Sequence, residues 1–249
     1  MKSLIVFAKA PVKGAVKTRL KKDTPLSDTD LLVLYTAFLK DTFVTAGKSS
    51  ADRVIVAYTP AESEDVMRNL AEEFIGGKDI DYLPQEGESF SDRIGHSFDH
   101  SHKAGSDFSI MIGSDSPTLH STAINKAFDL LEERWGCVLG PSGEGGIYLI
   151  GMKSGMSFDY ERIFSDGSEL VNFSLEAQRA GGNLALLGEV SDIDVASDLV
   201  TLLSIVESMK AAGEENFDFP FHTAQELSRL GLKVERSAGT REKMVVKNG

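Results

Sequence analysis

The sequence contains few cysteines, no long apolar run and a minority of basic residues. Cys137 is the single cysteine in 249 residues, so no intrachain disulfide can form. The longest apolar runs are too short to cross a membrane, and no amino-terminal signal pattern precedes them. Lys and Arg number 26 against 38 Asp and Glu, a formal net charge of -12, which argues against a nucleic-acid partner. We expect a cytoplasmic globular protein with no membrane partner and with Cys137 in its core.

Short apolar runs alternate with longer amphipathic segments, which is typical of an α/β fold. Between residues 136 and 151 two apolar runs flank a Gly-rich turn that leaves no room for a helix. These two strands are therefore antiparallel or cross irregularly, and the sheet is expected to be mixed. Strands are predicted at 3–8, 53–58, 80–83, 107–113, 136–140, 146–151 and 183–187, and helices at 27–46, 61–74, 89–104, 121–134, 168–180, 196–212 and 222–231.

The composition changes near Gly213, after which apolar runs become scarce. Residues 229–249 contain six basic residues and two acids, in contrast to the acidic chain as a whole. We therefore expect a domain over residues 1–212 and a C-terminal extension over 213–249. The end of that extension, from Ser237, is expected to be mobile.

A basic stretch follows the first predicted strand. Between Lys9 and Lys22 there are six basic residues and no acid, with Gly14 among them. A cationic loop that contains glycine and leaves the end of a buried strand is a typical position for a phosphorylated ligand in α/β proteins. Because most of the chain is acidic, this stretch should attract a small anion to one place. The six residues are Lys9, Lys13, Lys17, Arg19, Lys21 and Lys22.

Asp115 is the first candidate metal ligand. It follows the predicted strand 107–113, and ligands of open α/β sheets bind at the carboxyl ends of strands. An aspartate in that position can bind Mg²⁺ or Mn²⁺, which take oxygen ligands. The alternative is a turn that only caps the helix predicted from Ser121.

Asp192 and Asp194 form the second acidic segment. They alternate about Ile193, so in an extended chain they face the same side, and a carboxylate here would complete a metal site with Asp115. The alternative is a helix start, with Asp194 as the cap and Asp198 in the first turn. We interpret Asp198 as structural.

A Gly-rich segment lies between the two strands of residues 136–151. Four glycines in the seven residues 140–146 leave backbone N–H groups open to an anionic or sugar-like ligand, and the alternative is a hairpin without a ligand. The sequence has no Gly-Lys-Ser/Thr phosphate loop, no G-x-G-x-x-G and no G-x-S-x-G. P-loop, dinucleotide-binding and covalent-hydrolase functions are therefore not favoured.

Taken in order, these motifs resemble a known family over roughly residues 1–205. The chain is similar to bacterial and archaeal transferases related to phospholactate guanylyltransferase and molybdenum-cofactor guanylyltransferase, and most of all to a glycosyltransferase-like branch of that nucleotide-diphospho-sugar transferase superfamily. The matching segments are Phe7 to Leu20, Gln85 with Gly87, Gly113 to Pro117, Gly140-Pro141 with Gly145 to Gly151, and Asp192 to Asp194 with Asp198-Leu199.

The resemblance implies a three-layer α/β/α sandwich of the glycosyltransferase-A type with a mixed, mostly parallel sheet. It also implies Mg²⁺ or Mn²⁺ as cofactor, held by Asp115 with Asp194 or Asp192. Lys17, Arg19 and Asp115 would be the catalytic residues. The nucleotide would contact Ala8, Lys9, Gly14, Lys17, Arg19 and Ser114 and, near its base, Gln85 and Gly87, while the second substrate would lie on Glu144, Gly145 and Gly146.

Several positions depart from the family pattern. Lys13 stands where proline is usual, Glu144 where aspartate is usual, and Val195-Ala196 replace Thr-Pro. The resemblance favours a metal-dependent transferase that uses a nucleoside triphosphate or a nucleotide-diphosphate sugar with a small-molecule acceptor, and that can form a homo-oligomer. With a nucleoside triphosphate, the reaction would be nucleotidyl transfer to a phosphorylated small molecule. With a nucleotide-diphosphate sugar, it would be glycosyl transfer. The alternative is a nucleotide- or partner-binding module without catalysis.

Overall fold

The structure is a computed structural model that describes residues 1–213, 218–236 and 242–247. The chain divides into two compact units, which are described separately. Unit 1 comprises Met1–Ala10, Phe43–Ser114 and His120–Val190, and unit 2 comprises Pro11–Thr42, Asp115–Leu119 and Ser191–Gly249. The helix α1 (Asp28–Lys48) contributes to both units. The predicted boundary near residue 212 stays a prediction.

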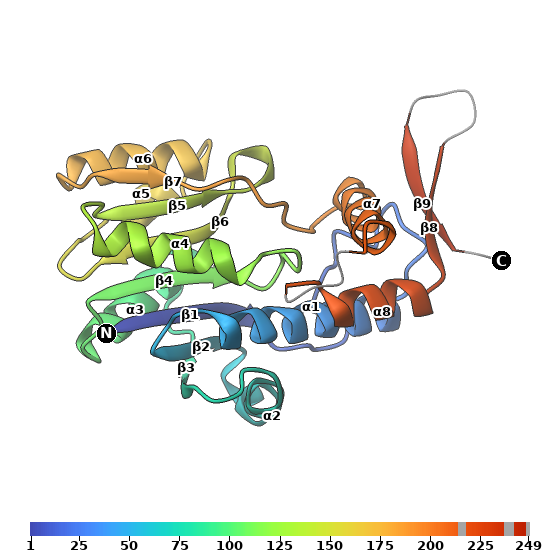
Figure 1. Cartoon of the computed structure of the whole chain (residues 1–249), viewed down its shortest axis with the longest axis horizontal. Helices are drawn as coiled ribbons and strands as arrows, with labels where there is room; N and C mark the ends of the chain where they lie inside the picture. Colours follow the sequence, from blue (N-terminus) through green and yellow to red (C-terminus); the bar gives the residue numbers. More distant parts are fainter. Residues whose placement is uncertain (214–217, 237–241, 248–249) are drawn as a thin grey trace. The chain divides into compact units, whose positions relative to one another are not determined.

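Unit 1 is built on a seven-stranded mixed sheet (Figure 1). Its order is β3-β2-β1-β4-β6-β5-β7, and β6 is antiparallel to both of its neighbours while the other pairs are parallel. All seven predicted strands are confirmed, including the antiparallel pair within 136–151. The strands are β1 (Lys2–Lys9), β2 (Arg53–Thr59), β3 (Asp79–Pro84), β4 (Phe108–Gly113), β5 (Cys137–Pro141), β6 (Ile147–Lys153) and β7 (Leu184–Leu186).

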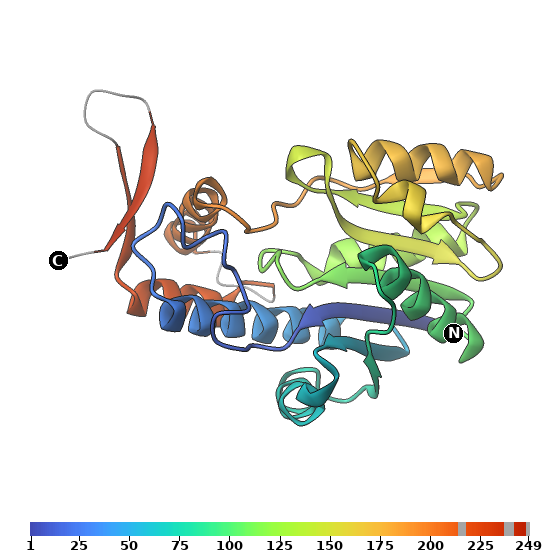
Figure 2. The same cartoon turned by 180° about the vertical axis from the view of Figure 1, so that it is seen from behind.

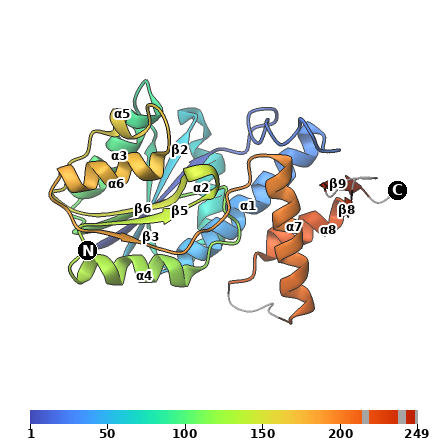
Figure 3. The same cartoon turned by 90° about the horizontal axis from the view of Figure 1, so that it is seen from above.

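Helices cover both faces of this sheet and make the three layers that the resemblance implies. Figure 3 shows α3 (Phe90–Lys103), α5 (Tyr160–Ile163) and α6 (Glu169–Arg179) over one face and α4 (Ser121–Glu132) over the other. A short 3₁₀ turn, Ala61–Ser63, leads into α2 (Glu64–Phe74), which contacts β2 and β3. The helix α5 was not predicted because four residues give too little periodicity to detect.

The helix α3 begins where its sequence predicts. The Ser89 hydroxyl accepts a hydrogen bond from the Asp92 N–H at 3.0 Å, and the Asp92 carboxylate accepts one from the Ser89 N–H at 2.9 Å. This reciprocal capping box satisfies two backbone donors at the start of the helix. Figure 2 shows α3 on the near side of the sheet in that view.

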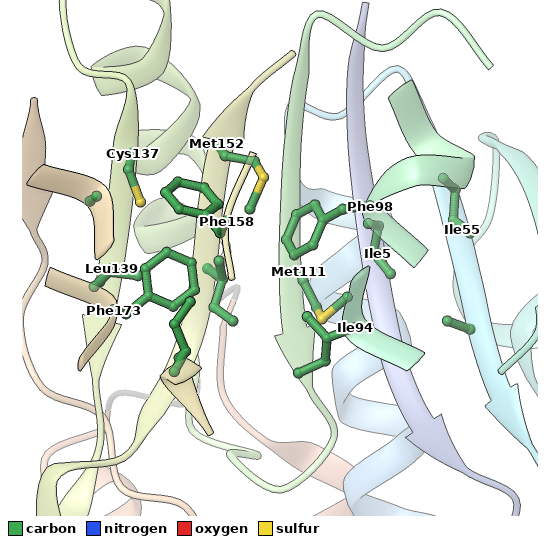
Figure 4. Packing of buried hydrophobic residues seen from close by; sticks show 14 of the residues in the cluster. Ile5, Ile55, Ile94, Phe98, Met111, Cys137, Leu139, Met152, Phe158 and Phe173 are labelled. Carbon is green, nitrogen blue, oxygen red and sulfur yellow. The ribbon is translucent and has the colours of Figure 1, made fainter. Parts of the chain in front are cut away.

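The core beneath α3, α5 and α6 consists of aliphatic strand residues and aromatic helix and loop residues (Figure 4). Cys137 lies fully buried in this cluster, and burial raises the pKa of its thiol to about 12. The thiol is therefore protonated at neutral pH and packs as a small apolar group, as predicted. The labelled members are Ile5, Ile55, Ile94, Phe98, Met111, Cys137, Leu139, Met152, Phe158 and Phe173.

Unit 2 contains the first part of α1, α7 (Ala196–Ala211), α8 (Phe221–Arg229) and a two-stranded antiparallel sheet. The strands are β8 (Leu232–Arg236) and β9 (Lys243–Lys247), and both contact α7. The expectation of a mobile end is thus wrong for residues 243–247, where Val245 is buried within a paired strand. Residues 237–241, 248 and 249 lie outside the described residues. None of the described helices is both long and apolar enough to span a membrane.

A buried carboxylate joins α1 to α8. Asp41 is 5% exposed, and its two oxygens accept hydrogen bonds from the N–H groups of His222 at 3.0 Å and Thr223 at 2.7 Å, in the first turn of α8. Burial raises the pKa of Asp41, and these hydrogen bonds from α8 partly oppose the rise. The contact spans 181 residues of sequence and holds the C-terminal segment on α1.

Replacing Asp41 should weaken the attachment of α8. Asp41→Ala leaves two buried N–H donors without an acceptor, and we expect the free energy of unfolding to fall by about 1–3 kcal/mol. Asp41→Asn keeps one acceptor oxygen and should lose less. Urea unfolding of both variants checks this, with the exposed Asp23→Ala as the control. A midpoint for Asp41→Ala equal to that of the control would contradict the prediction.

Candidate functional site

Buried apolar residues hold the basic loop between β1 and α1 in place. Val16 is 4% exposed and Leu20 is fully buried, and the Leu20 N–H donates to the Lys17 carbonyl at 3.1 Å. Lys17, between these anchors, has a φ of 51°, in the left-handed region that residues other than glycine rarely adopt. Such a backbone costs about 1–2 kcal/mol, so neighbouring contacts must hold it there.

Those contacts are two ion pairs within unit 2. The Lys17 Nζ lies 2.7 Å from Asp115 Oδ1 and 3.0 Å from Asp194 Oδ1. The Lys17 side chain is 3% exposed, whereas each aspartate side chain is 41% exposed. We call Lys17, Asp115 and Asp194 the lysine–aspartate cluster. The structure thus brings together three predicted site residues from segments that are far apart in the sequence.

Arg19 lies at the margin of this cluster. Its Nη1 is 4.0 Å from Asp194 Oδ2, and its side chain is 79% exposed. Such an exposed pair contributes little to stability. The guanidinium is therefore available to a ligand, in contrast to the buried Lys17 ammonium.

Hydrogen bonds hold the backbone of the segments that carry the two carboxylates. The Ile193 N–H donates to the Asp115 carbonyl at 2.9 Å, and the Ile193 side chain is 1% exposed. The Asp198 carboxylate accepts from the N–H groups of Asp194 and Val195, both at 2.9 Å, at the start of α7. Asp198 is therefore structural, as predicted.

Neither aspartate of the cluster caps a helix. The cap residue of α7 is Val195, and that of α4 is His120. The capping alternatives for Asp194 and Asp115 are therefore not observed. Both side chains turn to Lys17 instead.

Asp192 adds negative charge beside the cluster. Burial raises the pKa of Asp192, and repulsion from Asp194, Asp198 and Asp115 raises it further. Of these four carboxylates, those of Asp115 and Asp194 pair with the Lys17 ammonium, and that of Asp194 also lies near the exposed guanidinium of Arg19. The local charge therefore favours a further cation.

The donor atoms of the cluster fit a divalent metal that arrives with phosphate. Asp115 Oδ1 and Asp194 Oδ1 lie within 3.0 Å of the same nitrogen, so they converge on one cation position. In the described parts of the chain, no three His, Cys, Asp or Glu side chains gather closely enough to hold a metal by themselves. Mg²⁺ commonly uses one or two carboxylates and takes its other oxygens from phosphates and water. Asp115 and Asp194 meet that requirement.

The other predicted residues, apart from Gly14 in the basic loop, belong to unit 1. β1, β3, β4 and β5 run in the same direction, so the residues that follow them lie at one edge of the sheet. Lys9 is exposed at the end of β1, and Ser114 is buried just after β4. The Gln85 amide donates to the carbonyls of Ala8 at 3.1 Å and Ala57 at 3.0 Å, so its nitrogen joins two strand ends.

The loop between β3 and α3 packs on itself. Gly87 has a φ of 131°, and a Cβ there would lie 2.4 Å from the Asp92 Cβ. Arg93 Nε donates to the Gly87 carbonyl at 3.1 Å. Gly87 is therefore required by packing, whatever its role in binding a base.

Sequence reasoning did not single out Phe90, the first residue of α3. Its ring is 54% exposed and makes edge-to-face contacts with Phe7, at 5.8 Å between centroids, and Phe164, at 5.1 Å. Phe90 is in helical register with the buried Ile94 and Phe98, so the pattern alone would predict burial. The exposed ring at this edge of the sheet is a candidate ligand contact.

The Gly-rich loop after β5 is explained largely by its own packing. A Cβ on Gly145 would lie 2.6 Å from Ser168 Oγ, and one on Gly146 would lie 2.7 Å from Ser142 Oγ. The Ser168 hydroxyl also donates to the Gly145 carbonyl at 3.0 Å. Glu144 is exposed and has a left-handed φ of 57°. The second-substrate role of Glu144, Gly145 and Gly146 stays a prediction.

Solved structures share this fold at low sequence identity. A protein of Desulfovibrio desulfuricans G20, described as a candidate nucleotide-diphospho-sugar transferase, is 22% identical with a TM-score of 0.74, covering 92% of this chain and 95% of that one. A 4-diphosphocytidyl-2C-methyl-D-erythritol synthase of Anaerococcus prevotii DSM 20548 is 11% identical with a TM-score of 0.57, covering 83% and 96%. A cytidylyltransferase of Leptospira borgpetersenii serovar Hardjo-bovis (strain JB197) is 14% identical with a TM-score of 0.52, covering 92% and 94%.

The fold is therefore that of the nucleotide-diphospho-sugar transferases, as the sequence motifs indicate. A family model described as "Uncharacterized protein conserved in bacteria (DUF2064)" matches residues 42–167, half of the chain. The chain belongs to that family. A search of curated proteins finds no match.

Removing the ammonium should destabilise the cluster. Lys17→Met leaves the carboxylates of Asp115 and Asp194 close together without their shared cation, and we expect the free energy of unfolding to fall by about 1–3 kcal/mol. Lys13→Met is the matched control, because Lys13 is exposed in the same loop and its loss changes the net charge equally. Urea unfolding checks this, and equal midpoints for the two variants would refute it.

Proposed function

We propose that this protein is a metal-dependent transferase that uses a nucleotide donor. The observation that supports the proposal is the lysine–aspartate cluster, where a buried ammonium and two carboxylates converge beside the exposed Arg19. Cations that can pair with phosphates, next to carboxylates that can hold a divalent metal, are what a polyphosphate site requires. The fold shared with nucleotide-diphospho-sugar transferases agrees with this proposal.

The favoured reaction is nucleotidyl transfer. An oxygen of a phosphorylated small molecule attacks the α-phosphorus of a nucleoside triphosphate, the bond from that phosphorus to the β-phosphate oxygen breaks, and pyrophosphate leaves. No covalent enzyme intermediate is needed, so the protein contributes positioning and charge neutralisation. Lys17 and Arg19 would offset the charge that develops on pyrophosphate. The family resemblance also implies a phosphate contact for Lys9.

Asp115 and Asp194, with Asp192 beside them, would hold Mg²⁺ or Mn²⁺. When bound, such an ion polarises phosphate oxygens and neutralises part of their charge. The chain's own contribution is to orient the carboxylates. The hydrogen bond from the Ile193 N–H to the Asp115 carbonyl and the bond from the Asp194 N–H to the Asp198 carboxylate hold the backbone of both aspartates and support this proposal.

Glycosyl transfer from a nucleotide-diphosphate sugar is the second candidate. Glu144 is an exposed carboxylate on the Gly-rich loop, at the sheet edge where ligands of α/β proteins bind, and would contact the sugar or its acceptor. The six basic residues from Lys9 to Lys22 favour nucleotidyl transfer over glycosyl transfer, because a diphosphate sugar does not need a basic binding site for a triphosphate.

Within unit 1, we propose contacts of the nucleotide with the backbone around Ala8 and Ser114 and of the base with the segment of Gln85 and Gly87. The position of these residues at the carboxyl ends of β1, β4 and β3 supports this proposal. Gly14 in the basic loop and Gly145 with Gly146 would allow close backbone approach to the donor and the acceptor.

A thermal-shift panel of nucleoside triphosphates and nucleotide-diphosphate sugars, with and without Mg²⁺ or Mn²⁺, tests the function. A specific ligand at about a hundred times its dissociation constant stabilises the fold by ~2.7 kcal/mol. A metal-dependent shift with one triphosphate supports nucleotidyl transfer and identifies the base. A shift with diphosphate sugars alone supports glycosyl transfer, and no shift in folded protein favours the non-catalytic module.

Once a donor is identified, Asp115→Asn and Asp194→Asn should lower kcat/KM by about 100-fold or more, because orientation of the metal and the phosphates is lost. Asp23→Asn serves as the control, since Asp23 is an exposed acid that directly follows the basic stretch. Steady-state assays and circular dichroism check activity and folding together. Wild-type turnover by folded Asp115→Asn would refute the site assignment.

A further inference from the structure

We propose that the Lys17 ammonium occupies the cation position between the Asp115 and Asp194 carboxylates, so that a divalent metal binds there by displacing the ammonium. The proposal rests on the proposed function and deepens it. Because the displaced ammonium needs a new anionic partner, the ligand that binds well is a metal–polyphosphate complex, and the bare metal binds poorly.

The first argument is geometric. The Lys17 Nζ contacts the same two oxygens that a metal would use, Asp115 Oδ1 at 2.7 Å and Asp194 Oδ1 at 3.0 Å. Mg²⁺ binds carboxylate oxygens at about 2.0–2.1 Å. An ammonium and a divalent ion that share both oxygens would lie within a few ångströms of each other and repel strongly. One cation must therefore leave when the other binds.

The second argument is the burial of Lys17. Its side chain is 3% exposed, so solvent cannot replace the two carboxylates as partners of the ammonium. A buried ammonium without an anionic partner is strongly unfavourable. Displacement by a bare metal ion would therefore leave Lys17 uncompensated, whereas a phosphate brought by the same metal would pair with it.

The third argument is the backbone of Lys17. The left-handed φ of 51° persists because the two ion pairs hold the side chain between the aspartates. Arg19 is no substitute for Lys17, since its guanidinium is 79% exposed and reaches Asp194 alone, at 4.0 Å. The charge of Lys17 is thus the one that a metal must replace.

When metal and phosphate bind together, the aspartates and Lys17 each gain a new partner of opposite charge. The metal takes over the aspartates while the phosphates take over Lys17, so each ligand lowers the cost of binding the other. Metal and polyphosphate should therefore bind with positive coupling, and by linkage each raises the affinity of the other by the same factor.

The test is Mn²⁺ binding to the full chain without nucleotide, measured by calorimetry and by electron paramagnetic resonance of free Mn²⁺. Lys17→Met should bind Mn²⁺ more tightly than the wild type, by about 5- to 150-fold, the usual range of such couplings. Lys13→Met has the same net charge as Lys17→Met and should bind like the wild type. Asp194→Asn in the Lys17→Met background should abolish the gain.

Equal or weaker Mn²⁺ binding by Lys17→Met than by Lys13→Met would overturn the proposal. If Lys17→Met does not fold, Lys17→Gln provides the same comparison with a polar side chain of neutral charge. The outcome is separable from the proposed function. Nucleotide binding without a gain in Mn²⁺ affinity refutes the displacement of Lys17, and a gain without nucleotide binding refutes the transferase.

Discussion

The ammonium of Lys17 between two carboxylates is the interaction on which unit 2 depends most. It joins the loop after β1, the turn after β4 and the segment before α7, and it links residues as far apart in the sequence as Lys17 and Asp194, which are separated by 177 positions. Each of these segments is short and irregular, and none could fix its own conformation. The buried Lys17 side chain, its left-handed backbone and the bond from Ile193 to the Asp115 carbonyl are parts of one arrangement that forms together.

The same arrangement accounts for part of the positive charge in the basic loop, that of Lys17 and of Arg19 beside it. Lys17 balances aspartates that would otherwise repel one another. Burial raises the pKa of Asp192, and repulsion from the neighbouring aspartates adds to the rise. Groups that stabilise the fold in this way are also those that a phosphate and a metal would engage. In the proposed function, stability and ligand binding use the same charges, which is a common compromise at functional sites.

Most of the fold could be predicted from the sequence, because buried parallel strands are continuous apolar runs such as Leu4 to Ala8. The β8–β9 hairpin was missed because its strands are only five residues each and rich in charged residues, with Leu232 and Val245 as their buried members. The Asp41 cap was missed because its partners are 181 residues away. Lys17, Asp115 and Asp194 were each predicted as site residues, but the ion pairs between them depend on tertiary contacts that no local pattern contains.

The glycines of the candidate site are required by the fold itself, so their presence in a motif does not assign them a role in ligand binding. Gly87, Gly145 and Gly146 face neighbours that a Cβ would strike, and Gly87 and Gly145 also have a positive φ, so the fold itself accounts for them. Gly14 has a φ of 78° and open space around its Cα, so its requirement is conformational. A fold shared at 22% identity or less does not specify a substrate. The proposed chemistry therefore rests on charged groups, those of Lys17, Asp115 and Asp194, which converge within unit 2.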